Sequence, residues 1–315
     1  MKDSMFLNEH KRYTVFVKLN KYKFYYLLSA LGLLYFFIFH YLPMAGILIA
    51  FKQIQPFMTV QQMITAPWIG LKHFITFVNS YYFWNILGNT LAISFYSLLF
   101  GFPVPIILAI LINEIRRNKF KKVVQSIFYI PHFLSWVIVA SLVSIVFSPN
   151  DGIINQIIMF FGADPVFFLG NNRYIRSIIV GSNIWKEAGW NTIIYLAAIM
   201  GIDQTLYEAA SVDGATRFKK IWHITLPGMK FAISLILIMS CGRILNVGFE
   251  RVMLLYNPAT YAKADIIDTY VYRASFGDLQ YSFAAAVNLF KSAVSLILVL
   301  TANWASKKLG EEGIW

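Results

Sequence analysis

The sequence predicts an all-α, polytopic membrane protein with six transmembrane helices. Of its 315 residues, 58% are hydrophobic and only 13% are charged, and the mean hydropathy is +0.60; soluble domains are about half apolar and a quarter charged. The apolar residues form six long runs, each near the roughly 20 residues that a spanning helix needs. The basic residues behind the net charge of +12 cluster between these runs, which indicates membrane topology and anionic lipid rather than nucleic acid.

The six expected spans follow one another from residue 25 to residue 304. In order, they are about Tyr25–Ala50, Ile86–Ile112, Val124–Phe147, Ile178–Ile202, Phe231–Val247 and Phe283–Trp304. The first run is too long for the apolar core of a signal peptide, and no small-residue cleavage site follows it. Prolines within or beside spans predict kinks rather than breaks; they are Pro43, Pro103, Pro105 and Pro131.

The distribution of Lys and Arg predicts that both termini are cytoplasmic. The N-terminal segment, the second connection, the loop after residue 202 and the C-terminal end together hold more than twice as many Lys and Arg as the other connections, and such connections lie inside. We therefore expect a basic cytoplasmic juxtamembrane segment, 1–24, and a transmembrane domain, 25–315. The external segments, about 51–85, 148–177 and 248–282, are either partner-binding loops or caps between helices.

A polar, partly basic loop, Asp203–Pro227, separates the fourth and fifth expected spans. Thr205 and Glu208 have the spacing of a capping box, which predicts a helix that begins near Leu206. The dipeptide Asp213-Gly214 predicts a turn, and Pro227 suits the first turn of a new helix.

The sequence of this loop resembles the EAA loop of permease subunits in type I, binding-protein-dependent ABC importers. The matching residues are Glu208, Ala209, Ala210, Asp213, Gly214, Ala215, Ile224, Leu226 and Pro227. In that family the loop faces the cytoplasm and docks on the ATPase subunit. The resemblance therefore implies an ATPase-coupling loop, 203–227, in which the apolar side chains of Phe218 and Trp222 make contacts. The alternative is an ordinary amphipathic loop helix between spans.

Flanking stretches are similar to the carbohydrate-uptake family, in its oligosaccharide and polysaccharide-fragment branch. Ile184–Lys186 and Gly189–Asn191 are similar to the carbohydrate-uptake family, and Asn303-Trp304 with Gly310–Trp315 to that branch, whereas Tyr129–Trp136 is similar to the permease core of these importers in general. The resemblance implies a type I ABC importer permease core that forms half of the translocation pathway for a sugar in a bacterial cell membrane. The implied partners are a second homologous permease subunit, two ABC ATPase subunits that hold ATP and Mg, and an extracytoplasmic solute-binding protein.

Polar and aromatic side chains within the spans are the candidates for the substrate pathway. A charge in lipid costs about 3 kcal/mol or more, so it usually faces a cavity or a partner, and a sugar needs hydrogen-bonding groups beside aromatic rings. The candidates are Trp185, Lys186, Glu187, Trp190, Arg243, Asn246, Asn288 and Lys291. The alternative role for each is structural, in interhelical salt bridges or interface aromatics.

Spacing along a helix refines these candidates. Neighbouring residues point about 100° apart, so we do not expect Lys186 and Glu187 to neutralise each other optimally, and each should meet another helix or the cavity. The i,i+3 spacing should place Asn246 beside Arg243 on one helix face. The same spacing relates Asn288 to Lys291.

The motifs of enzymes are missing from the sequence. It contains no phosphate-binding Gly-x-x-x-x-Gly-Lys-Ser/Thr loop, no metal-binding spacing of His or Cys, and no catalytic constellation. We therefore expect no catalytic residue, no metal site and no cofactor bound by this chain. Two alternatives stay open: an ABC permease for a non-sugar small solute, and an ion-coupled secondary transporter in which Glu187 is the candidate proton carrier.

Overall fold

The structure is a computed structural model that describes residues 21–308. The expected basic segment 1–24 therefore lies almost wholly outside the described residues. Within them, the regular elements are helices, and one isolated antiparallel bridge joins Lys52 to Trp68. The expected all-α architecture is confirmed for this part of the chain.

The first half of the chain contains the helical elements from α2 to α10. They are α2 (Lys23–Phe36), the π-turn η1 (Phe37–Tyr41), α3 (Leu42–Met44), η2 (Ala45–Phe51), α4 (Val60–Thr65), α5 (Lys72–Val78), α6 (Phe83–Gly101), α7 (Pro103–Asn113), α8 (Asn118–Tyr129), η3 (Ile130–Phe133), α9 (Trp136–Val146) and α10 (Ile153–Phe160).

The second half contains the longest helices. Its elements are η4 (Phe168–Gly170), α11 (Ile175–Met200), α12 (Gln204–Val212), α13 (Arg217–Lys220), the π-turn η5 (Ile221–Thr225), α14 (Leu226–Gly228), α15 (Lys230–Gly242), α16 (Phe249–Leu255), η6 (Pro258–Thr260), α17 (Tyr261–Ala264), α18 (Ile267–Tyr272), the π-turn η7 (Arg273–Gly277) and α19 (Tyr281–Lys308).

Three described helices are long and apolar enough to cross a membrane: Lys23–Phe51, Phe83–Asn113 and Tyr281–Trp304. Two bent helix pairs raise this number to as many as five. The remaining expected span corresponds to α11, whose 26 residues make about 39 Å of helix. Its polar residues keep it from passing a test based on hydropathy, so the number of six stays a prediction.

The third expected span is broken rather than kinked. The helix Asn118–Phe133 and α9 meet at an angle of 102°. Leu134 has an extended backbone, and the Oγ of Ser135 accepts a hydrogen bond from the N–H of Ile138, which starts α9 as a new helix. The sequence expectation of a mild kink at Pro131 is therefore wrong, because a side-chain cap restarts the helix a few residues later.

Two other prolines lie inside continuous helices. Pro43 follows the π-turn η1, and Pro227 follows the π-turn η5; in each turn the closing N–H, of Leu42 and of Leu226, bonds to the carbonyl five residues earlier. A proline lacks the N–H that would bond to the carbonyl four residues earlier, and its ring clashes with that carbonyl. The wider π-turn uses hydrogen bonds over five residues, so that the helix continues without the missing bond. The expectation that Pro227 begins a new helix is wrong.

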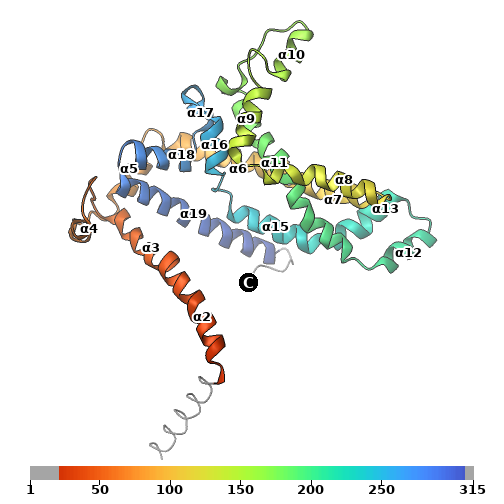
Figure 1. Cartoon of the computed structure of the whole chain (residues 1–315), viewed down its shortest axis with the longest axis horizontal. Coiled ribbons are helices and arrows are strands. Elements are labelled where there is room, and N and C mark those ends of the chain that lie inside the picture. Colours follow the sequence, from red (N-terminus) through yellow and green to blue (C-terminus); the bar gives the residue numbers. More distant parts are fainter. Residues whose placement is uncertain (1–20, 309–315) are drawn as a thin grey trace, which may run out of the picture.

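The helix α11 forms the centre of the packing. It contacts α6, α7, α8, α15 and α16, and Figure 1 shows α15 and α19 running beside each other along the long axis of the molecule. A Cβ at Gly189 of α11 would lie 1.9 Å from the carbonyl oxygen of Phe128. Only glycine permits this approach of α11 to α8.

The segment 248–282, which the sequence predicts to be external, is packed into the body as short helices. Val252, Leu255 and Ile266 join Ile175 and Ile179 in one buried cluster. Further along, Ile267 and Val271 pack into a second cluster around Phe77 and Phe83. This segment caps the helices, in agreement with one of the two alternatives that the sequence left open.

By contrast, the first helix stands apart from the body. Every residue of α2 is exposed, and Figure 1 shows α2 running away from the other helices. Contact with α5 and α19 begins only at η2.

Candidate functional site

A cavity of about 370 Å³ lies between α6, α7, α11, α15 and the segment that joins α15 to α16. Its lining contains apolar residues from all of these elements together with ten polar side chains. They are Ser94, Ser97, Asn183, Glu187, Asn191, Tyr195, Ser240, Arg243, Asn246 and Arg251. The volume falls in the range of small-molecule sites, and hydroxyl and amide groups are suited to sugar hydroxyls.

Four buried polar atoms in this cavity have no hydrogen-bond partner among the described residues. They are the Oγ atoms of Ser94 and Ser97, the Oη of Tyr195 and the Nε of Arg251. Ser94 and Ser97 lie one turn apart on α6, so both hydroxyls lie on the same face of that helix. A buried polar group left unpaired costs about 1–3 kcal/mol, and native proteins rarely tolerate several together. The cavity is therefore prepared for a polar occupant.

Arg251 is the most deeply buried cation of the cavity. Its side chain extends from α16 and its residue is 5% exposed. Burial lowers the pKa of Arg251 to about 10, against the opposing effect of Glu187, so the guanidinium stays charged at neutral pH. Gly248, with a φ of 95°, lies beneath it, and a Cβ at this glycine would approach the Nε of Arg251 to 3.2 Å.

A cluster of charged side chains joins α11 to η3. The Nζ of Lys186 donates a hydrogen bond of 2.6 Å to the carbonyl of His132, and it lies 3.4 Å from Oε1 of Glu187. The Nδ1 of His132 is 2.8 Å from Oε2 of Glu187. Lys186 and Glu187 lie within ion-pair distance, but the shorter contact of each is with His132 on η3, so they do not simply neutralise each other. The expectation that each meets another element is confirmed.

Aromatic rings surround this cluster. Trp190 stacks on His132, with centroids 4.5 Å apart and planes at 6°. Trp185 lies apart from the main cavity and lines a second pocket, mostly apolar, between α9 and α11. The structure thus brings Lys186, Glu187 and Trp190 together and leaves Trp185 on another wall.

Of the candidates in the fifth and sixth expected spans, two line the cavity and two do not. The helix α15 ends at Gly242, so the expected common helix face of Arg243 and Asn246 does not exist, and a turn joins them instead. Both nevertheless line the cavity. Lys291 pairs with Asp268 outside the cavity, and Asn288 is exposed elsewhere on α19. These last two do not belong to the same site.

Sequence reasoning missed several residues of the site, namely Ser94, Ser97, His132, Asn183, Ser240, Gly248 and Arg251. Serines and asparagines on apolar helices carry no pattern that separates a cavity from a lipid face. Arg251 was counted among the external basic residues, and only its packing against α9 and α11 buries it. Among the described residues, no three His, Cys, Asp or Glu side chains gather as a metal site would require.

The loop between α11 and α15 forms a second candidate site. Its first helix, α12, is capped by Asp203, whose carboxylate accepts a 2.9 Å hydrogen bond from the N–H of Thr205. This bond lowers the pKa of the Asp203 carboxyl. The predicted cap at Thr205 is therefore wrong by two residues, because the aspartate is already positioned to cap. Glu208 and Ala209 are exposed on α12, and Ala210 is half-buried.

The turn predicted at Asp213-Gly214 is a Schellman motif. Gly214 has a φ of 71°, its N–H bonds to the carbonyl of Ser211, and the N–H of Ala215 bonds to the carbonyl of Ala210 at 2.8 Å. This pair of bonds closes a helix through a left-handed residue, where glycine is favoured. The turn sends the chain into α13, capped by Thr216.

The second half of the loop presents aromatic rings outward. Phe218 on α13 and Trp222 on η5 stack at 6.3 Å, and they are 73% and 61% exposed. Ile224 is half-buried in η5, while Leu226 and Pro227 lie on α14. The Oη of Tyr207 lies 2.9 Å from Oγ1 of Thr225 and ties the two halves together.

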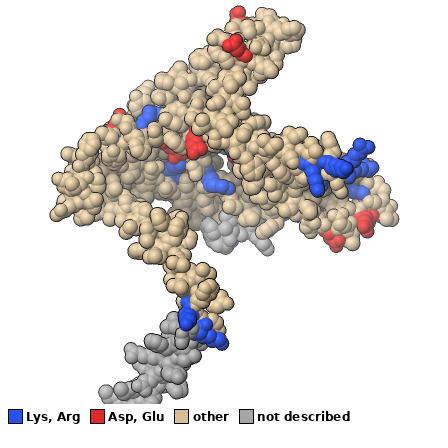
Figure 2. Space-filling model, in the orientation of Figure 1, with Lys and Arg blue, Asp and Glu red and all other residues tan. Residues whose placement is uncertain are grey.

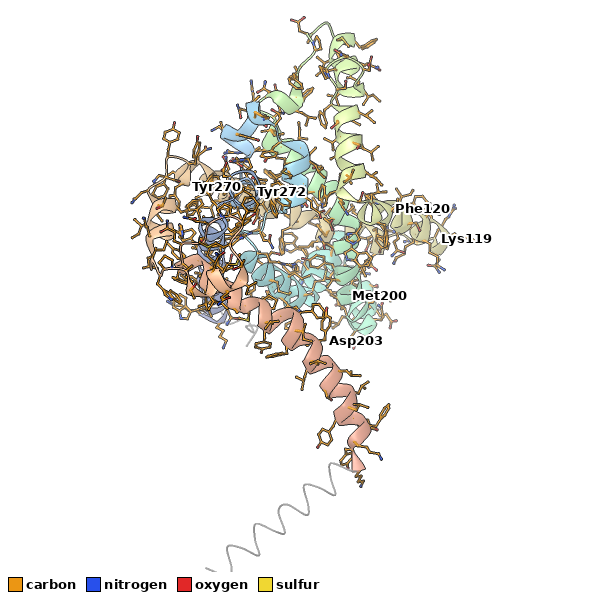
Figure 3. All side chains as sticks on the ribbon, turned by 60° about the vertical axis from the view of Figure 1, so that its left-hand side comes forward. Lys119, Phe120, Met200, Asp203, Tyr270 and Tyr272 are labelled. Atoms are coloured by element: carbon orange, nitrogen blue, oxygen red, sulfur yellow. The ribbon has the colours of Figure 1, made fainter. Side chains whose placement is uncertain are left out.

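Basic residues gather at the same end of the molecule as this loop. Figure 2 shows blue atoms concentrated where α8 begins and where α13 lies, with red atoms beside them at α12. In Figure 3, Lys119 and Phe120 of α8 lie with Met200 and Asp203 on the side away from Tyr270 and Tyr272. Two of the connections that the sequence predicted to be cytoplasmic therefore share one end.

Comparisons with known proteins agree with these features. Residues 101–310 match the family described as binding-protein-dependent transport system inner membrane component. The chain is 47% identical over 313 residues to the polygalacturonan/rhamnogalacturonan transport system permease protein YteP of Bacillus subtilis (strain 168), covering 99% of this chain and 97% of that protein.

Solved structures show the same likeness. One is a crystal structure of a bacterial ABC transporter involved in the import of the acidic polysaccharide alginate; a chain of it matches with a TM-score of 0.86 and 44% identity, covering 93% of this chain and 98% of that one. A second, of a bacterial alginate ABC transporter in complex with an alginate pentasaccharide-bound periplasmic protein, matches with a TM-score of 0.86 and 43% identity, covering 94% and 98%. The chain belongs to the family of binding-protein-dependent transport system inner membrane components.

Proposed function

We propose that this chain is one of two permease subunits of an ATP-driven importer, and that it forms half of the pathway for an oligosaccharide. Family membership and the names of its relatives support transport of a sugar delivered by a binding protein. The single observation that carries the proposal is the polar cavity with its unpartnered hydroxyls. Hydroxyl groups that lack partners in the protein match a ligand that is itself covered with hydroxyls.

The coupling loop supplies the link to ATP. In this proposal α12 and the turn at Gly214 dock on an ATPase subunit, and the exposed rings of Phe218 and Trp222 make apolar contacts there. ATP and Mg are held by two ATPase subunits, and a second permease completes the pathway. The six spans and the cytoplasmic location of both termini belong to the same proposal.

In mechanism, closure of the ATPase subunits around ATP moves the docked loop. That motion is passed to α11, because little chain separates α11 from α12. The N–H of Ile202 bonds to the carbonyl of Ile199 at the end of α11, and the next residue, Asp203, caps α12. The walls of the cavity on α11 then shift relative to α6 and α15. A proton-driven route is less compatible with this site, since its carboxylate, Glu187, is held by Lys186 and His132.

The test is reconstitution. The chain is purified in mild detergent from its own membrane, its companions are identified by mass spectrometry, and the complex is placed in liposomes with its binding protein. We expect a P-loop ATPase and a second permease, with sugar uptake that requires ATP. Uptake by this chain alone, without ATP and dependent on an ion gradient, would overturn the proposal. If the complex takes up only a non-sugar solute, the assignment as an ABC permease stands, but the proposal that the substrate is a sugar is overturned.

A variant of the turn tests the docking role. Gly214→Asp places a side chain and a charge where φ is 71°, so we expect the ATPases to hydrolyse ATP while uptake falls at least tenfold. Gly201→Ala is the matched control, since its Cβ would find no atom nearer than 3.5 Å. Wild-type uptake by correctly inserted Gly214→Asp would count against docking through this turn.

A further inference from the structure

We infer that Arg251 binds a carboxylate of the transported sugar, so that the cavity selects oligosaccharides that contain uronic acid units. The inference rests on the proposed function and names the substrate class of the same cavity. It assigns the role of specificity determinant to a residue on α16, outside the long helices.

The first argument is the unsatisfied state of a buried cation. The residue is 5% exposed, it lines the cavity, and its Nε has no acceptor among the described residues. Buried charges in proteins are normally paired or hydrogen-bonded, because an unpaired one is costly. A buried arginine in the lining of an open cavity can take up an anion from outside the chain.

The second argument is that the nearby carboxylates are unavailable. Glu187 faces the same cavity, but both its oxygens are engaged, one by His132 and the other by Lys186. Glu250, next to Arg251 on α16, is exposed and does not line the cavity. The remaining charged side chain of the lining, Arg243, is positive. The lining therefore holds two arginines and one carboxylate, and the carboxylate of Glu187 that acts on Arg251 is shared with His132 and Lys186.

The third argument is the chemistry of the neighbouring groups. A guanidinium presents a planar fork of donors that matches the two oxygens of a carboxylate. Ser94, Ser97 and Tyr195 belong to the same lining, and their hydroxyls, unpartnered within the described residues, can serve ring hydroxyls. An inorganic anion would need only the cation, whereas this combination of one charge and several hydroxyls fits a sugar acid.

The backbone beneath Arg251 is adapted to this position. Gly248 has a φ of 95°, and a Cβ there would approach the guanidine Nε to 3.2 Å, tighter than nine in ten real Cβ contacts. The glycine therefore leaves room for the arginine side chain beside the backbone.

The experiment compares two substrates that differ only in charge. The substrates are saturated trigalacturonate and its carboxyl-reduced product, galactotriose. Both are assayed for ATP-driven uptake in proteoliposomes that hold the complete transporter. Uptake is initiated with binding protein loaded with each sugar at saturation, so that selection by the binding protein does not enter the ratio of the two rates. The variants are Arg251→Gln and Arg251→Lys, with Glu250→Gln as the control from the adjacent position on the same helix.

For Arg251→Gln we expect the ratio of trigalacturonate to galactotriose uptake to fall roughly 10- to 100-fold, the equivalent of one charge-assisted hydrogen-bonding pair. Arg251→Lys keeps the charge but loses the fork, so its ratio should lie between those of Arg251→Gln and the unsubstituted protein. Glu250→Gln should leave the ratio unchanged.

The opposite results are equally distinct. If Arg251→Gln inserts and assembles normally but both uptake rates fall in parallel, the arginine is structural and the inference is overturned. An unchanged ratio overturns it as well. If the unsubstituted complex takes up neither sugar with ATP, the proposed function itself fails, and that failure is recognised before any variant is measured.

Discussion

The loop 203–227 and the cavity are built in contrasting ways. The loop takes its shape from consecutive residues: Asp203 begins α12, Gly214 ends it, and Thr216 begins α13. The cavity takes its shape from segments far apart in sequence, since Ser94, Glu187 and Arg251 reach it from three different helices. The loop could therefore be predicted from local signals. The cavity depends on how closely the helices approach one another.

The largest expected effect is at the close backbone contact between α11 and α8. Gly189→Ala would press a methyl group onto the carbonyl oxygen of Phe128, at 1.9 Å in the present geometry. The atoms that would meet the methyl group belong to the backbone of α8, so relief of the clash requires one helix to move. We expect the free energy of unfolding to fall by about 3 kcal/mol, the upper end of the usual range for overpacking. The measurement is the thermal unfolding midpoint of the detergent-solubilised complex.

The control for this variant lies on the same helix. Gly181→Ala adds a Cβ with no other atom within 4 Å, and replacing a mid-helix glycine by alanine is favourable in itself by about 0.5–1 kcal/mol. We expect its midpoint to equal or exceed that of the unsubstituted protein. Equal midpoints for Gly189→Ala and Gly181→Ala would show that the close approach of α11 to α8 does not constrain the fold.

A smaller effect is expected from the charged cluster beside the cavity. Glu187→Gln keeps the shape of the side chain but removes the charge that faces Lys186 and His132. We expect a loss of about 1–3 kcal/mol, since hydrogen bonds to charged groups contribute on this scale. A double-mutant cycle with Lys186→Gln, read from unfolding midpoints, isolates the pair. Strict additivity of the two substitutions would mean that the pair contributes nothing.

The smallest effect is expected in the loop. Tyr207→Phe removes the hydroxyl that lies 2.9 Å from Oγ1 of Thr225, a partly buried neutral hydrogen bond that contributes about 0.5–1.5 kcal/mol. Amide hydrogen exchange should become faster in α12, with little change in α11. Tyr81→Phe is the control, as Tyr81 is 92% exposed. Unaltered exchange in α12 would show that the capping bonds alone hold the loop.

The same contrast explains which predictions succeeded. The turn at Gly214 and the long apolar helices were predicted because each follows from neighbouring residues. The start of α12 was placed two residues late, and Pro227 was assigned to a helix start, since competing caps and π-turns leave no distinct pattern in the sequence. Asn288 and Lys291 were grouped with Arg243 because all are polar within apolar runs, although Lys291 has its own partner in Asp268.

By itself, the sequence determined that the chain is helical and apolar enough for a membrane, and it identified the loop by residues whose roles are local. Tertiary structure alone decided that Arg251 is buried in the cavity without a partner, and that Glu187 is occupied by Lys186 and His132. The physical reason is range. Capping and turn formation involve residues a few positions apart, whereas the burial of a charge depends on which distant helices surround it.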